Sequence, residues 1–233
     1  MKSKQFIITL SILAGLSSGL LAQTTISSDI HLIKGKKHSK AVSTVSGDIF
    51  VGNGAVLEQS LSTVSGDVEI GSKAQVEDIS AVSGDIAVGK GAKTGQIETV
   101  SGDISIYEKC EIRGSIETVS GDINCDSGSQ IENDIKTVSG DIELDDAILK
   151  GSIKTVSGDI SLFNGSTVAG DIIVNRKSDF VLFHDGVLKI IVDMHSVVNG
   201  SILVKEKDSK VIVYLANGGK VKGEIVNAEV RRQ

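Results

Sequence analysis

The hydrophobic and polar residues of the chain follow a short motif that returns with a period of about 18–19 residues. The hexapeptide TVSGDI occupies residues 99–104, 118–123, 137–142 and 155–160, and further copies or close variants begin at Thr44, Thr63 and Ala81. An eighth and weaker copy, TISSDI, begins at Thr25. A nearly constant period of this length is typical of a repeat protein whose units stack in one direction.

A second period of six residues runs inside each repeat. Val64, Ile70, Val76 and Val82 follow one another at this spacing. Three six-residue sides make a coil with a triangular cross-section, and each coil adds roughly 4.8 Å to the stack. The sequence therefore predicts an all-β fold, a parallel β-solenoid of about eight regular coils followed by irregular C-terminal coils.

Alternation within the first side predicts which residues face the core. The expected inward residues are Val45, Gly47, Ile49 and Val51, and the expected outward residues are Thr44, Ser46, Asp48 and Phe50. On this interpretation serine and threonine form columns on the outer surface.

Three segments follow from the pattern. Residues 1–22 read as a secretory signal peptide, with Lys2 and Lys4 before an apolar run, and the alternative is an uncleaved membrane anchor. Residues 23–174 hold the regular repeats. Residues 175–233 are strand-rich but irregular and are expected to close the stack, with Phe180, Phe183 and Tyr214 filling its open end. The mature chain is expected to be exported, to the periplasm, the cell surface or the medium, without stable membrane insertion.

The amino-acid composition restricts which side chains can form the core and which partners the chain is expected to bind. The chain has no proline or tryptophan, and aromatic residues make up 3%, so the core must be built from aliphatic side chains. A net charge of −6 argues against a nucleic-acid partner. Cys125 falls in the same column as Ile106, whereas Cys110 lies further round its own coil, so we expect two buried free thiols and no disulfide.

Every repeat carries one aspartate, and stacking would place these aspartates in a single column. The column consists of Asp29, Asp48, Asp67, Asp85, Asp103, Asp122, Asp141 and Asp159. Neighbouring charges at this spacing repel, so something must offset the repulsion. The main hypothesis is hydrogen bonding to hydroxyls or to amides at the corners of the coils. The alternatives are a calcium-binding ladder, an ice-binding surface and a surface for another ligand.

No arrangement of residues predicts catalysis or a cofactor. The aspartates are spread evenly, one to a coil, whereas an active site gathers different groups at one place. The pair Asp145 and Asp146 reads as a solvated corner. The histidines lie outside any metal-binding spacing, at His31, His38, His184 and His195.

The repeat resembles a bacterial β-strand repeat family labelled as adhesins, a domain of unknown function. The likeness is carried by IETVSGDI and IKTVSGDI, where an isoleucine stands two residues before each motif. A weaker likeness, in GSIETVSGDI, is to bactofilins, which are polymer-forming triangular β-helices. The resemblance implies a β-solenoid on an exported bacterial protein. Together with the even repeat, it leads us to expect a non-enzymatic, structural or adhesin-like surface module whose partner is a cell-surface or envelope polymer or protein. The alternatives are a self-assembling scaffold and a carbohydrate-active β-helical enzyme.

Overall fold

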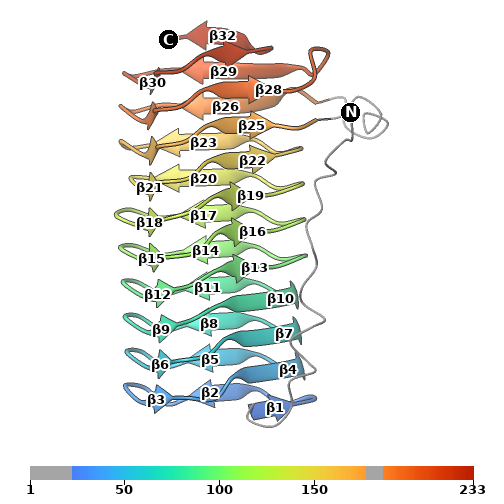
Figure 1. The fold of residues 1–233 in the computed structure, drawn as a ribbon, viewed down its shortest axis with the longest axis vertical. Coiled ribbons are helices and arrows are strands. Elements are labelled where there is room, and N and C mark those ends of the chain that lie inside the picture. Colours follow the sequence, from blue (N-terminus) through green and yellow to red (C-terminus); the bar gives the residue numbers. More distant parts are fainter. Residues whose placement is uncertain (1–22, 177–185) are drawn as a thin grey trace.

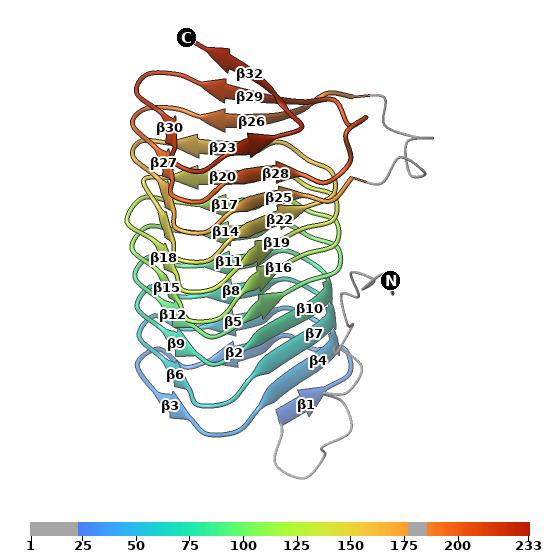
Figure 2. The ribbon, with the colours of Figure 1, turned by 45° about the horizontal axis from the view of Figure 1, so that its top comes forward.

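The protein is a straight stack of coils in which every described element is a β-strand. The computed structural model describes residues 23–176 and 186–233 (Figure 1). Each coil contributes one strand to each of three parallel sheets, except the last coil, which has no described strand in the third, so that the sheets have 11, 11 and 10 strands. Figure 2, in which the top of the rod comes forward, shows the three sides of the coils. The prediction of a triangular parallel β-solenoid is confirmed.

The strands are short, and the three sheets take them in strict rotation. Sheet A consists of β1 (Gln23–Thr25), β4 (Val42–Ser46), β7 (Leu61–Ser65), β10 (Ile79–Ser83), β13 (Ile97–Glu98), β16 (Ile116–Glu117), β19 (Ile135–Lys136), β22 (Ile153–Thr155), β25 (Ile172–Val174), β28 (Ile202–Val204) and β31 (Ile225–Val226). Sheet B consists of β2 (Ile30–Leu32), β5 (Ile49–Val51), β8 (Val68–Ile70), β11 (Ile86–Val88), β14 (Ile104–Ile106), β17 (Ile123–Cys125), β20 (Ile142–Asp145), β23 (Ile160–Phe163), β26 (Leu188–Val192), β29 (Val211–Leu215) and β32 (Glu229–Arg232). Sheet C consists of β3 (Lys37–His38), β6 (Val56–Leu57), β9 (Gln75–Val76), β12 (Lys93–Thr94), β15 (Glu111–Ile112), β18 (Gln130–Ile131), β21 (Ile148–Leu149), β24 (Thr167–Val168), β27 (Val197–Val198) and β30 (Lys220–Val221).

The core is a set of aliphatic columns that run along the rod. On sheet B, for example, Ile86 pairs with Ile104, Ile104 with Ile123 and Ile123 with Ile142, and all four are buried. Stacking like on like lets β-branched side chains pack from coil to coil and removes their surface from water. No described helix is long and apolar enough to span a bilayer, since the described residues form strands and connections.

The motif itself lies on a corner, which makes the predicted alternation wrong in its first half. Thr44 is buried at 1% exposure, whereas Val45 is 37% exposed. Ile49 and Val51 do face the core, as predicted. The prediction assumed one continuous strand over 44–51, but the chain turns between β4 and β5, and the turn changes which face successive side chains occupy.

The buried threonines form an internal column. Its members are Thr44, Thr63, Thr99, Thr118, Thr137 and Thr155, and Ala81 takes the place in the fourth coil. Within the described part of the chain, the hydroxyls of Thr63, Thr99, Thr118 and Thr137 are buried without a hydrogen-bond partner. The threonine columns expected on the outer surface, on which the ice-binding hypothesis depended, are therefore inside.

The two cysteines lie in different columns of the core, Cys110 at the corner between sheets B and C and Cys125 on sheet B. Cys110 occupies a column with Ala92 and Ser129, where a buried residue follows each turn. Cys125 lies between Ile106 and Leu144 on sheet B. Both cysteines are buried and free, as predicted. Burial raises the pKa of both thiols above the ordinary cysteine value.

The C-terminal residues continue the same three sheets with longer connections. Ile160 pairs with Ile190, and Ile190 pairs with Val213, so both steps along the sequence are longer than those of the regular coils. The looser spacing predicted for this part thus comes from extra residues between sheets A and B. Phe180, Phe183 and His184 lie outside the described residues. Tyr214 does not fill the end of the stack, since it lies on the outer face of sheet B near Arg231.

Substitution of the corner glycines tests whether close backbone contact between coils stabilises the stack. Gly121 has φ +151°, and a Cβ there would lie 2.0 Å from the carbonyl oxygen of Gly102. Gly54 has φ +67° with open space around it. Gly121→Ala should lower the free energy of unfolding by roughly 3–5 kcal/mol, and Gly54→Ala by about 1–2 kcal/mol, measured by denaturant unfolding. Equal losses would show that close approach of the coils is not the constraint.

Candidate functional site

The aspartate column lies on the corner between sheets A and B, directly after the corner glycines. In the copies from Gly66 to Gly158 the glycine has φ between +120° and +158°, a region that side chains disfavour. Each of these glycines also lies against the backbone of the glycine one coil before it. The turn therefore brings successive aspartates into register along the rod.

Each aspartate accepts a hydrogen bond from the backbone N–H one coil further on. The Oδ1 atoms of Asp29, Asp48, Asp67, Asp85, Asp103, Asp122 and Asp141 accept from the next aspartate's N–H at 2.7–3.0 Å. Asp159 ends the row by accepting from Lys189 N–H at 2.7 Å. We call this row the aspartate ladder. It confirms the hypothesis that corner amides satisfy the carboxylates.

A second corner shows that this bond does not require a charge. Between sheets C and A, Asp134 accepts from Ser152 N–H at 2.9 Å, and Ser152 Oγ accepts from Asp171 N–H at 3.0 Å. Asp171 and Ser201 continue the row, accepting at 2.8 and 3.0 Å. A serine hydroxyl thus replaces a carboxylate in the same role. The negative charge in every copy of the aspartate ladder exceeds what the hydrogen bond needs.

Calcium binding by the ladder would have to draw on carboxylate oxygens beyond the Oδ1 atoms that the backbone amides already use. Among residues 23–176 and 186–233, no cluster of three or more carboxylate, histidine or cysteine side chains is placed to hold a metal ion. Asp146, of the pair expected at a solvated corner, lies in a turn with φ +48° and accepts from Ser127 Oγ at 2.5 Å.

A groove lies beside the ladder on the outer face of sheet B. Its volume is about 640 Å³, within the usual range for ligand sites. Residues from five consecutive coils line it: Asp48, Phe50, Asn53, Asp67, Val68, Glu69, Ile70, Gly71, Ser72, Asp85, Ala87, Gly89, Lys90, Tyr107, Glu108 and Asp126. The ladder forms one wall, and the corner between sheets B and C forms the other.

The surface is hollowed here because the outward side chains of sheet B become smaller along the rod. Along this column Phe50 is followed by Glu69, then by Ala87 and Ser105, which are short. Phe50 is stacked on His31, with ring centroids 4.7 Å apart. Tyr107, at the end of β14, is 48% exposed on the far side. Two aromatic rings therefore lie at the borders of a shallow floor.

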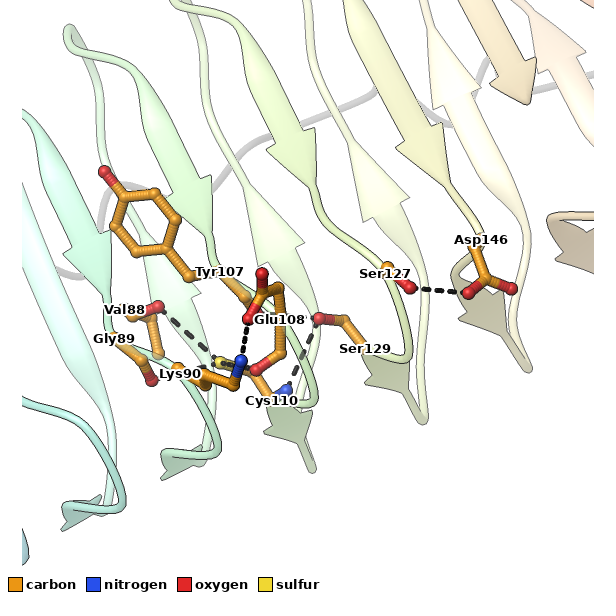
Figure 3. Close-up of polar contacts among 9 residues, drawn as sticks. All are labelled: Val88, Gly89, Lys90, Tyr107, Glu108, Cys110, Ser127, Ser129 and Asp146. Atoms are coloured by element: carbon orange, nitrogen blue, oxygen red, sulfur yellow. Dashed lines mark hydrogen bonds and ion pairs between the residues drawn. The ribbon is translucent and has the colours of Figure 1, made fainter. Parts of the chain in front are cut away.

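The groove is strongly acidic. Six carboxylates line it, and the one lysine, Lys90, is paired with Glu108 of the next coil (Figure 3). Burial raises the pKa of Asp126, and repulsion from Asp145 and Glu108 adds to this effect. Such a surface attracts cationic groups, and its aromatic rings can contact them face-on.

The sequence predicted the ladder but not the groove. The ladder residues share one position of an obvious motif, whereas Phe50, Glu69, Ala87 and Tyr107 occupy variable positions. Aligning the repeats by their sheet B register would have shown the drop from a large to a small outward residue at Ala87. The wall of the groove at the corner between sheets B and C depends on turn geometry, which cannot be predicted from the period of the repeat.

The comparisons with known proteins add one match. The family model described as Toastrack DUF4097 matches residues 93–212, about half of the chain. No curated protein and no solved structure matches the chain.

The ladder gives a prediction that separates its hydrogen bond from its charge. Asp122→Ala removes the acceptor of Asp141 N–H and should lower the free energy of unfolding by about 1 kcal/mol. Asp122→Asn keeps the Oδ1 acceptor and removes one charge from the row, so its stability should stay within about 0.5 kcal/mol of the parent. Thermal and urea unfolding measure both. An asparagine variant as unstable as the alanine variant would contradict this account.

Proposed function

Because the chain belongs to the Toastrack DUF4097 family, for which no function is assigned, its role has to be inferred from its own surface, and we propose that it is a non-enzymatic, exported β-solenoid that acts as an adhesin-like surface module. In this role the rod is a rigid carrier, and the groove on sheet B is the contact surface. The partner presents positive charge, as a lysine- or arginine-rich segment of an envelope protein or a cationic group of an envelope polymer.

The observation that carries the proposal is the acidic groove. Its floor crosses five coils, so a partner would be held by side chains that the stack keeps at fixed spacing. Preformed sites lose little freedom on binding, which favours affinity. The surplus charge of the ladder supports the same conclusion, since a neutral side chain would satisfy the corner amides equally well.

The arrangement of the carboxylates favours binding over catalysis. Acid–base catalysis needs groups whose environments differ, so that one is protonated while the other is ionised. The ladder carboxylates instead have nearly identical partners from Asp29 to Asp141. An enzyme would have to depart from this uniformity at some point along the row.

Self-assembly into a polymer is a second candidate, favoured by the final coil. Val221 and Ile225 are only partly covered, and β30, β31 and β32 have no described strand on their outer side. The charges of the two end coils disfavour end-to-end assembly. Residues 23–41 carry four lysines and one aspartate, and residues 210–233 carry five lysines and arginines against two glutamates. Both end coils are basic, so end-to-end contact brings like charges together.

The groove predicts a charge-specific binding defect. Residues 23–233 should bind a fluorescent lysine-rich peptide saturably at low salt, and Glu69→Lys should weaken binding by about tenfold or more. Glu224→Lys is the matched control, since Glu224 is an exposed residue of the last coil and lies outside the groove. It should change the affinity by less than about twofold. Fluorescence anisotropy measures both variants.

Two outcomes would contradict the assignment of the groove. Equal losses in the two variants would mean that the peptide senses only the total charge of the rod. Binding that never saturates would mean that the surface has no defined site.

The charged end coils predict a monomer. Light scattering of residues 23–233 at low salt should give the mass of one chain, and negative-stain images should show short rods. Filaments under these conditions would favour the polymer and overturn the argument from end charge.

A further inference from the structure

The rod has an acidic shaft and basic ends. Residues 42–176 carry 22 aspartates and glutamates against nine lysines and arginines, whereas both end coils have an excess of basic residues. The uneven distribution is hidden in the overall net charge of −6. An anionic partner would therefore be attracted to an end of the rod and repelled by its sides.

The first coil concentrates its positive charge in one short stretch. Lys34, Lys36, Lys37 and Lys40 fall close together in the sequence, and all four are exposed. Among the described residues only Lys37 of these forms an ion pair, with Glu58 at 2.6 Å. The other three ammonium groups can contact a partner without breaking an ion pair of the rod.

The first coil also exposes two large aliphatic side chains. Ile26 is 76% exposed and Ile33 is 64% exposed, the highest values for large hydrophobic residues in the described part of the chain. They flank β2, one at each corner of sheet B. In the next coil the corresponding places are taken by Val45 and by Gly52. Neither isoleucine is needed by the core, since both lie outside it.

We propose that the first coil docks on the surface of an anionic phospholipid bilayer. The lysines contact headgroup phosphates, and Ile26 and Ile33 enter the boundary between headgroups and acyl chains. Basic residues beside exposed aliphatic residues are the combination that binds such interfaces. The isoleucines favour a bilayer over a soluble polyphosphate, which offers no apolar phase.

The charge of the shaft sets the orientation. A rod lying on sheet A or sheet B would bring the aspartate ladder, on the corner between them, to the anionic surface. A rod standing on its first coil keeps most of the shaft beyond the screening distance of about 8 Å at physiological salt. Docking therefore leaves the groove of sheet B facing the surroundings, and it uses a surface separate from that groove.

Co-sedimentation with vesicles tests the docking. Residues 23–233 contain all 32 described strands and thus the whole described core. We expect this chain to bind vesicles in which about a third of the lipid is phosphatidylglycerol, to release them as salt rises, and not to bind vesicles of phosphatidylcholine alone. This experiment uses the unsubstituted sequence, so its result does not depend on how a substitution affects folding.

Substitutions at the two ends of the rod test whether the first coil is the surface that binds the vesicles. Lys34→Glu with Lys36→Glu should reduce binding by about tenfold or more, and Ile26→Ser with Ile33→Ser by about threefold or more. Lys220→Glu with Lys222→Glu makes the same charge change at the other end of the rod, where no exposed large hydrophobic residue is described, and should change binding by less than about twofold. Thermal unfolding of each variant checks the fold.

Three results would overturn the proposal. Equal binding to neutral vesicles would remove the role of the lysines. Equal loss in the variant with both Lys220 and Lys222 replaced would remove the assignment to the first coil. Competition by inorganic polyphosphate, together with unchanged binding of the isoleucine variant, would mean that the coil recognises phosphate and not a bilayer.

Discussion

The stack depends on close backbone contact at the corner between sheets A and B. From Gly66 to Gly158 each coil there places a glycine against the glycine of the coil before it, so closely that a Cβ on Gly121 would overlap the carbonyl oxygen of Gly102. The aspartate that follows each glycine then bonds to the next coil through Oδ1. Because both contacts run between equivalent residues, the register fixed at one coil is passed to the next. The aliphatic columns can pack like on like only because this register holds.

Stability and surface charge are coupled by the same corner. The ladder bond is available to a serine, as Ser152 shows at the neighbouring corner, yet this corner carries a carboxylate in every copy. Each of the eight coils that carry the motif thus adds a negative charge at the border of sheet B. The repulsion this creates is offset by the backbone amide donors that each carboxylate accepts from. The excess is what gives the groove its acidity.

Much of the architecture could be predicted from the sequence, because a short and nearly constant period leaves few alternatives to stacked coils. The ladder followed from the same period. The orientation of Thr44 and Val45 could not be obtained, since the turn between β4 and β5 interrupts the alternation on which such predictions depend. The groove could not be obtained either, because it arises where Ala87 follows Glu69 and Phe50 in a column that the motif does not include. The exposure of Ile26 in the first coil could be learned only from the structure, because the residues at the same motif position in later coils are more covered.

The ladder also has consequences for how such a chain changes in evolution. Every rung from Asp48 to Asp141 has an acceptor from one coil and a donor from the next, so any rung can be followed by any other. A duplication or deletion of the codons for one repeat would lengthen or shorten the rod by one coil and leave the remaining rungs intact. Insertions within a coil are accepted where the motif is absent, as between β28 and β29. The length of the rod can therefore drift in whole coils, and with it the distance between its two ends.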